Sequence, residues 1–334
     1  KTYLLLQFMI CLGIESTAHT FGVSVIDEKS VLANVRKSFT TTEGGMLPSD
    51  VADHHVKNAP DAIAQALDEA NKTSEDIDLI AFSQGPGIGH MLRIGAMAAR
   101  TLALRWHVPL VGVNHCIAHL QVASMLFDVT DPVLLYVSGA NTQVIAFEGG
   151  RYRIFGETLD IGAGNFLDSV ARAMGLGFPG GPKVYAYAKE GKEYIPLPYT
   201  VKGMDVSFGG LLTNIRQKVQ KGDMAFTDLA YSIQETIFAM LMEVSERALA
   251  HCEKSELLLG GGVACNRRLQ QMATIMCEER GARCLIPPDD LLVDNAAMIA
   301  WSGILRYRSE GALAIEESGI RPYERTDDII ISGS

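Results

Sequence analysis

The chain has 334 residues, of which 48% are hydrophobic and 20% are charged. This balance is ordinary for a folded globular protein and excludes a mainly disordered chain. The formal net charge of −10 disfavours a protein that grips nucleic acid over a uniformly basic surface. An RNA substrate would therefore require a local basic patch or a basic partner.

Residues 1–8 are expected to be an extension or a cloning remnant ahead of Met9, because no small-residue cleavage site follows their apolar run. No stretch of about 18 apolar residues is present, so no membrane span is expected. The six cysteines contain no C-x-x-C pair and their spacing suggests no disulfide framework. A reducing cytoplasm is the expected compartment.

Taken in chain order, the elements occur twice. Residues 9–35 alternate apolar and polar positions between tight turns, which predicts strands joined by turns, and residues 132–158 have the same layout. In each half a helical stretch, a buried strand, a glycine-rich turn and another helix follow; these are residues 51–71 and 79–89 in the first half, and 230–252 and 256–269 in the second. Strands alternating with helices predict an α/β fold with a mostly parallel core. We expect two duplicated lobes, residues 9–130 and 131–326, that face each other across a cleft.

Three glycine-bearing turns follow predicted strands: GIESTAHT (13–20), VSGANTQ (137–143) and LGGGVACN (259–266). Glycine allows close backbone approach, and nearby amides and hydroxyls can then donate to phosphate. A single turn of this kind is more often plain geometry than a ligand site. Three in equivalent places resemble the phosphate and adenosine loops of the actin, sugar-kinase and Hsp70 (ASKHA) superfamily. They point to a nucleotide in the interlobe cleft.

The stretch VNHCIAHL (113–120) places His115 and His119 four residues apart. Asn114 is a good N-cap, so the helix is predicted to begin at His115 with both imidazoles on its inward stripe. Two buried core histidines and half of a metal site are both compatible with this spacing. A zinc-protease motif would need a glutamate between the histidines, and none is present. Further ligand candidates are Tyr136 and Asp294, the latter expected in the first turn of a late helix; such a set suits iron or zinc.

Short sequence motifs that follow one another in a fixed order through most of the chain make the functional interpretation more specific. The chain resembles the threonylcarbamoyladenosine-transferase family, once labelled O-sialoglycoprotein endopeptidase, and most closely the archaeal and eukaryotic branch that supplies the catalytic subunit of KEOPS. The resemblance runs from Met9 to about Asp327 and is carried by GIESTAHT, EGGMLPSDVADHH, AFSQGPGIGHMLR, VGVNHCIAHL, YVSGANTQV, FGETLDIGAGNFLD, GFPGGPKV, KGMDVSFGGLLT, YSIQET, GGVACNRRL and VDNAAMIA. It departs from the family pattern at Leu47, Ala140, Tyr185 and Gly209.

The resemblance implies the roles of individual residues. One iron or zinc ion would be held, and catalysis exerted through it, by His115, His119, Tyr136 and Asp294. The phosphates and acyl group would lie against the turn made by Tyr136, Val137, Ser138, Gly139, Ala140 and Asn141. The ribose, purine and remaining adenosine contacts would come from Asp168, Gly181, Tyr185 and Asn266.

The implied reaction transfers a threonylcarbamoyl group from threonylcarbamoyl-AMP to N6 of the adenosine 3′ of the anticodon, in tRNAs that read ANN codons. The implied ligands are the metal ion and an adenine nucleotide, which is threonylcarbamoyl-AMP, ATP or AMP. The implied partners are tRNA and the KEOPS subunits: a small kinase/ATPase subunit, a dimerising subunit and a kinase-binding subunit. Two alternatives stay open at this point. They are a metalloprotease, motivated by the two histidines alone, and a non-catalytic ATP-binding scaffold, motivated by Ala140 and Tyr185.

Overall fold

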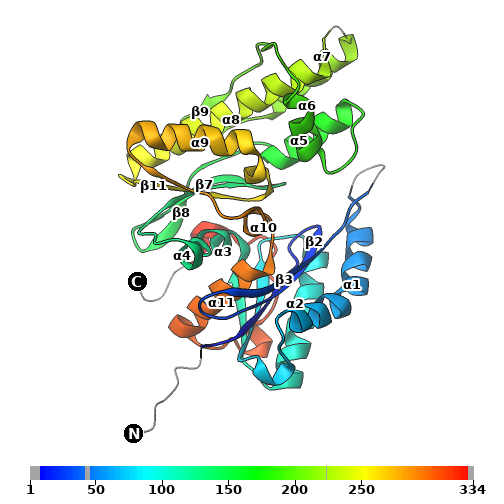
Figure 1. Ribbon diagram of the computed structural model, residues 1–334, viewed down its shortest axis with the longest axis vertical. Helices are drawn as coiled ribbons and strands as arrows, with labels where there is room; N and C mark the ends of the chain where they lie inside the picture. The colour runs from blue at the N-terminus through cyan, green and yellow to red at the C-terminus, as the bar shows by residue number, and fades with distance from the viewer. Residues whose placement is uncertain (1–7, 42–45, 223, 330–334) are drawn as a thin grey trace. The chain divides into compact units, whose positions relative to one another are not determined.

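The structure is a computed structural model that describes residues 8–41, 46–222 and 224–329 (Figure 1). Contacts between residues divide the chain into two compact units. Unit 1 contains the described residues up to 39, residues 46–127 and those from 294 onward, and unit 2 contains residues 128–293 together with 40 and 41. The sequence had suggested a single division near residue 130. The structure instead returns the last segment of the chain to unit 1.

Unit 1 is built on a five-stranded sheet with the order β3-β2-β1-β4-β5. Its strands are β1 (Cys11–Glu15), β2 (Thr20–Ile26), β3 (Val31–Ser38), β4 (Leu79–Gly85) and β5 (Leu110–Asn114). Its helices are α1 (Pro48–Glu69), α2 (Gly89–Trp106), α3 (His115–Gln121), α4 (Ala123–Leu126) and α11 (Ala296–Glu310), with short 3-10 turns η1 (Ser74–Asp76), η3 (Ile315–Glu317) and η4 (Thr326–Asp328). All four strands other than the edge strand β3 are buried along their whole length, because helices cover both faces of the sheet.

The helices on the two faces of this sheet pack at different distances from it. On one face, Leu12 and Ile14 of β1 pack in a core with alanines of α1 and α2. On the other face α11 lies against β1, β4 and β2, and Figure 1 shows it in orange beside the blue N-terminal strands. A Cβ atom at Gly13 would lie 2.3 Å from the carbonyl oxygen of Ala296, and one at Gly303 would lie 2.3 Å from the Cβ of Ala81. Glycine at these two positions therefore permits the close packing of α11.

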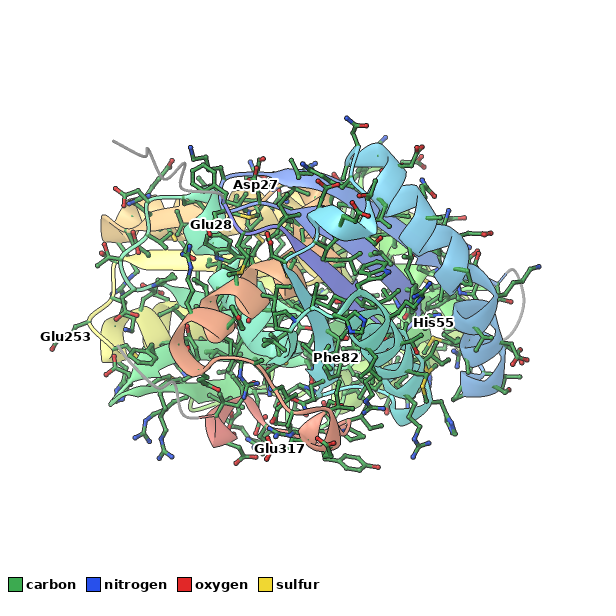
Figure 2. All side chains as sticks on the ribbon, turned by 90° about the horizontal axis from the view of Figure 1, so that it is seen from below. Asp27, Glu28, His55, Phe82, Glu253 and Glu317 are labelled. Carbon is green, nitrogen blue, oxygen red and sulfur yellow. The ribbon has the colours of Figure 1, made fainter. Side chains whose placement is uncertain are left out.

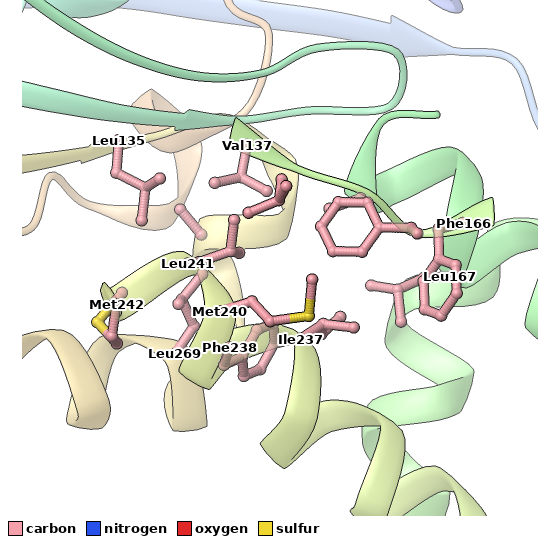
Figure 3. Close-up of a cluster of buried hydrophobic side chains, with 14 of the residues drawn as sticks. Leu135, Val137, Phe166, Leu167, Ile237, Phe238, Met240, Leu241, Met242 and Leu269 are labelled. Carbon is pink, nitrogen blue, oxygen red and sulfur yellow. The ribbon is translucent and has the colours of Figure 1, made fainter. Parts of the chain in front are cut away.

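Unit 2 repeats the same topology with the order β12-β11-β6-β7-β8. Its strands are β6 (Val133–Val137), β7 (Thr142–Glu148), β8 (Arg151–Glu157), β11 (Glu256–Gly260) and β12 (Arg283–Leu285), with a separate ribbon of β9 (Val201–Lys202) and β10 (Asp205–Val206). Its helices are α5 (Ala163–Ala173), α6 (Gly180–Ala188), α7 (Gly209–Lys221), α8 (Phe226–His251), α9 (Arg267–Arg280) and α10 (Asp289–Leu292), with the 3-10 turn η2 (Gly262–Cys265). Figure 3 shows the core of this unit, where Leu135 and Val137 of β6 face Ile237 and Leu241 of α8.

The predicted duplication is confirmed by these two sheets. In each sheet, the first strand in chain order pairs antiparallel with the second, and the second pairs antiparallel with the third. The first strand also pairs parallel with the fourth, and the fourth pairs parallel with the fifth. The expectation of a mostly parallel sheet is wrong. In each sheet the hairpins contribute as many antiparallel strand pairs as there are parallel ones. The α/β class and the repeated order of elements hold.

Across the part of the chain that the structure describes, no helix combines the length and the apolar character needed to span a membrane.

One buried histidine of unit 1 has a purely local role. His55 of α1, labelled in Figure 2, is 0% exposed, and its ring meets that of Phe21 edge-on at 5.5 Å. Its Nε2–H donates to the carbonyl oxygen of Ala18 at 3.0 Å. Burial lowers the pKa of His55 to about 4, in spite of the opposing effect of this hydrogen bond.

We predict that His55 makes stability depend on pH. Above pH 6.5 the side chain is neutral in both states, whereas between pH 6.5 and about 4 only the unfolded chain binds the proton. Stability should therefore fall as pH falls through this window, by roughly 1–3 kcal/mol from His55. Urea unfolding of wild type and His55→Gln across the window would show a difference that shrinks towards low pH; parallel curves would contradict the prediction.

Candidate metal centre and glycine-rich turns

The start of α3 is fixed by a side-chain cap, as predicted. The side-chain oxygen of Asn114 accepts hydrogen bonds from the backbone N–H groups of Cys116 at 3.0 Å and Ile117 at 3.2 Å. This cap begins the helix at His115 and places His119 one turn later on the same face. The two imidazoles are buried, with ring centroids 4.9 Å apart and planes at 82°. The predicted stripe is interrupted at Val122, because α3 ends at Gln121 and the short α4 follows.

Asp294 lies beside both histidines within unit 1. Its Oδ1 is 3.3 Å from Nε2 of His115 and 3.4 Å from Nε2 of His119. The expectation that Asp294 begins a helix is wrong by a small margin. The N-cap of α11 is Asn295, whose side chain accepts from the backbone N–H of Met298 at 3.0 Å, so Asp294 precedes the helix.

These three side chains form a group of potential metal ligands, in which the donor atoms all lie within 4.8 Å of one another. Two ligands bound about 2.1 Å from one ion lie about 3.0–3.4 Å apart, which matches the distances to Asp294. Burial lowers the pKa of His119, which favours the neutral imidazole. Burial alone would raise the pKa of Asp294, but the imidazoles of His115 and His119 hold it well below its usual range. The group therefore fits a metal ion in donor type and spacing.

A residue that the sequence did not single out supports this group. Glu15, the last residue of β1, is 0% exposed, and its Oε2 accepts from Nδ1–H of His115 at 3.0 Å. The sequence predicts the GIESTAHT stretch only as a glycine-bearing turn. The available signal was an acidic residue at the end of an otherwise apolar buried strand, which requires a partner.

The second predicted turn, residues 137–143, lies in unit 2 and begins at the end of β6. It closes on itself through a hydrogen bond from the N–H of Ser138 to the carbonyl of Asn141 at 2.9 Å. The N-terminus of α5 supports it, because Gly164 donates to the carbonyl of Ser138 at 3.0 Å and Asn165 to that of Gly139 at 2.8 Å. Ala140 is exposed on this turn.

Glycines allow two other segments to meet this turn at backbone distance. A Cβ at Gly162 would lie 2.4 Å from both the carbonyl carbon and the oxygen of Ala140. A Cβ at Gly261 would lie 2.3 Å from the carbonyl oxygen of Val137, and Gly261 has a φ of +90° that favours glycine. The second and third glycine-rich turns are therefore in contact within unit 2.

The remaining predicted nucleotide residues of unit 2 have structural partners. Asn266 caps α9 by accepting from the N–H of Arg268 at 2.9 Å, and its amide donates to Gln234 at 2.9 Å. Asp168 accepts from the N–H of Gly180 at 2.6 Å at the start of α6.

Three further predicted residues lie on unit 2 as well. Gly181 follows in the first turn of α6, and Tyr185 lies one turn later with Nζ of Lys189 4.7 Å from its ring centroid. Tyr136, on β6, is 1% exposed.

Comparisons with known proteins decide the family. The sequence model of the tRNA N6-adenosine threonylcarbamoyltransferase family matches residues 30–301. The chain belongs to this family. A protein of that name from Thermococcus kodakarensis is 55% identical over 321 residues, which cover 96% of this chain and 98% of the relative. Another from Archaeoglobus fulgidus is 49% identical, with 97% and 99% covered.

A longer relative extends the same comparison. The probable bifunctional tRNA threonylcarbamoyladenosine biosynthesis protein of Methanosarcina mazei is 50% identical over 96% of this chain, which spans 59% of that protein.

Solved structures of low sequence identity show the fold alone. HypF of T. kodakarensis matches with a TM-score of 0.65 at 14% identity, covering 93% of this chain and 50% of HypF. Component A of (R)-2-hydroxyglutaryl-CoA dehydratase from Acidaminococcus fermentans matches with a TM-score of 0.56 at 15% identity, covering 88% and 97%. The transferase family member described here therefore shares its duplicated α/β fold with these solved structures.

The contact at Gly162 leads to a prediction for this transferase family member. Gly162→Ala should destabilise unit 2 by about 1–3 kcal/mol, because the added methyl meets backbone that cannot yield without moving the turn. Its φ of −66° and ψ of 150° suit any residue, so the cost is steric. Gly210→Ala in α7 is the control, since its Cβ would meet nothing within 4 Å. Thermal unfolding equal for Gly162→Ala and wild type would overturn this expectation.

Proposed function

We propose that this protein transfers a threonylcarbamoyl group from threonylcarbamoyl-AMP to N6 of the adenosine 3′ of the anticodon, in tRNAs that read ANN codons, and that a metal ion held by His115, His119 and Asp294 serves the transfer. Family membership supports the reaction. The observation that carries the metal-dependent mechanism is the convergence of three donor atoms in unit 1. The proposed metal is iron or zinc, since both accept imidazole and carboxylate ligands.

The chemistry explains why such a site is useful. The exocyclic amine of adenine is a weak nucleophile because its lone pair is delocalised into the ring. A bound ion supplies a Lewis acid that orients the acyl group and stabilises negative charge on its oxygens. The two histidines and Asp294 would hold the ion in place, and the burial of the two imidazoles keeps water from their side of it.

Unit 2 is proposed to bind the nucleotide part of the substrate. The turn Val137–Asn141, braced by the N-terminus of α5, offers backbone amides and the Ser138 hydroxyl to phosphate. Asp168, Gly181 and Tyr185 gather around the start of α6 and are proposed to contact ribose and purine. The assignments of Asn266 to adenosine and of Tyr136 as a fourth metal ligand rest on the family resemblance.

Transfer RNA is the proposed macromolecular substrate. Its anticodon loop is single-stranded, so the acceptor base can be turned out and presented. The net charge of −10 supports the proposal that basic partner chains contribute to RNA binding. KEOPS-type partners, namely the small kinase/ATPase, dimerising and kinase-binding subunits, and a cytoplasmic location complete the proposal. The peptidase alternative gains no support, because Cys116, Ile117 and Ala118 between the histidines supply no general base.

Loss of a metal ligand should abolish modification. We expect His115→Ala and His119→Ala to lower threonylcarbamoylation by at least about 100-fold, since removing even an outer partner of a ligand costs 10–100-fold. The assay combines threonylcarbamoyl-AMP, unmodified tRNA and partner subunits, and quantifies the modified nucleoside by mass spectrometry alongside the metal content of the protein.

The matched control is His107→Asn, which changes an exposed histidine of the same unit at a left-handed position that asparagine tolerates. It should retain full activity and metal. Normal modification by both ligand variants would refute the metal mechanism while leaving the transferase reaction standing.

A further inference from the structure

We propose that Glu15 is a positioning residue for the metal centre, which orients the His115 imidazole and fixes its tautomer, and that Thr17 in turn holds the Glu15 carboxylate. This inference rests on the proposed function, since it concerns the same metal-ligand group. It assigns a role to the GIESTAHT turn of unit 1 that differs from phosphate binding.

The two nitrogens of His115 face two different carboxylates. Nδ1 lies 3.0 Å from Oε2 of Glu15, whereas Nε2 lies 3.3 Å from Oδ1 of Asp294. An ionised carboxylate only accepts hydrogen bonds, so the bond to Glu15 requires a proton on Nδ1. The neutral imidazole then carries its lone pair on Nε2, the nitrogen that faces Asp294 and lies with the donor atom of His119. Glu15 thus selects the tautomer that can bind a metal.

The other oxygen of Glu15 is occupied by Thr17. Oε1 accepts from the backbone N–H of Thr17 at 2.7 Å and from its hydroxyl at 2.5 Å. Each carboxylate oxygen therefore has its own partner, which leaves the group little rotational freedom. Thr17 sets the plane of the carboxylate. The carboxylate is the nearer partner of the imidazole at 3.0 Å, and the Thr17 hydroxyl oxygen lies 3.4 Å from the same Nδ1.

Thr17 is itself held by the segment that joins β4 to α2. The N–H of Ile88 donates to the carbonyl of Thr17 at 2.8 Å, and a Cβ at Gly87 would lie 2.8 Å from the same oxygen. The neighbouring Ser16 donates its N–H to the hydroxyl of Ser83 at 3.0 Å. The turn that carries Thr17 is consequently fixed against the sheet, and its position does not depend on a ligand.

The charges around Glu15 agree with a role in which it supports a metal ligand and does not bind the metal itself. Among the described residues, no lysine or arginine forms an ion pair with this fully buried carboxylate, and its Oε2 is hydrogen-bonded to the imidazole of His115. A buried carboxylate needs compensating positive charge. The two carboxylates of Glu15 and Asp294 flank the His115 imidazole, and a divalent cation would offset their negative charge. A purely structural role for Glu15 would not require the second carboxylate on the far side of His115.

The test measures the affinity for zinc in the absence of tRNA and of threonylcarbamoyl-AMP. Glu15→Gln preserves shape but supplies an amide that can donate to Nδ1 and favour the wrong tautomer. We expect it, and Thr17→Val, to weaken zinc binding by about 10–100-fold in chelator competition. Thr17→Ser keeps the hydroxyl that holds the Glu15 carboxylate and should bind zinc within about threefold of wild type.

Imidazole ¹⁵N spectra of the metal-free full chain give a second readout that a merely structural role would not move. Wild type should show a proton on Nδ1 of His115, and Glu15→Gln should lose that preference while its thermal unfolding midpoint stays close to that of Thr17→Ser. Unchanged zinc affinity and an unchanged tautomer in Glu15→Gln would overturn the inference.

The two proposals fail in different ways. If wild type takes up neither zinc nor iron, the metal mechanism of the proposed function is wrong, while the tautomer in the metal-free chain still decides whether Glu15 orients His115. If wild type binds metal and Glu15→Gln binds it equally, the positioning role fails alone.

Discussion

The close packing of α11 on the first sheet is the constraint on which the candidate metal centre depends. Ala296, the first residue of this helix, meets β1 at Gly13 so closely that any side chain there would collide with the helix backbone. Further along, Ser302 donates to Gln121 at 2.6 Å and the indole of Trp301 donates to Ser124 at 3.0 Å, which ties α11 to the segment that follows the histidines. Asp294 stands immediately before this anchored helix. Its position beside the histidines is thus a consequence of backbone packing.

The duplicated sheets carry different chemistry in equivalent places. Glu15 at the end of β1 accepts from the hydroxyl of Thr17, in the turn that follows, and from the imidazole of His115. The corresponding turn of unit 2, between β6 and β7, offers mainly backbone groups and rests on the N-terminus of α5. The same topology therefore places a glutamate carboxylate at this position in unit 1 and a turn contacted by glycines in unit 2. This is the behaviour expected when function resides in the turns and the sheet serves as scaffold.

Local features of this chain could be predicted from its sequence, and long-range ones could not. The hairpins, the Asn114 cap and the shared face of His115 and His119 all depend on residues a few positions apart, and the structure contains them. The return of α11 to unit 1 depends on Gly13 and Ala296, which are far apart in sequence and give no periodic signal. The same holds for Glu15, which meets its histidine across 100 positions of the chain. The sequence predicts Asp294 in the first turn of a helix, whereas Asn295, which directly follows it, is the N-cap.

The partners of a buried histidine distinguish a core residue from a site residue. His55 and His115 belong to the same unit and are almost equally buried. His55 donates to a backbone carbonyl and packs against Phe21, an arrangement that satisfies a neutral ring and needs no charge. His115 instead lies between the carboxylates of Glu15 and Asp294, with a second imidazole at its edge. Neutral core histidines do not require carboxylates on two sides, and a buried negative charge such as that of Glu15 is costly to desolvate unless positive charge offsets it. The acidic surroundings of His115, more than the spacing of the two histidines, are what favour a metal site over a packed core.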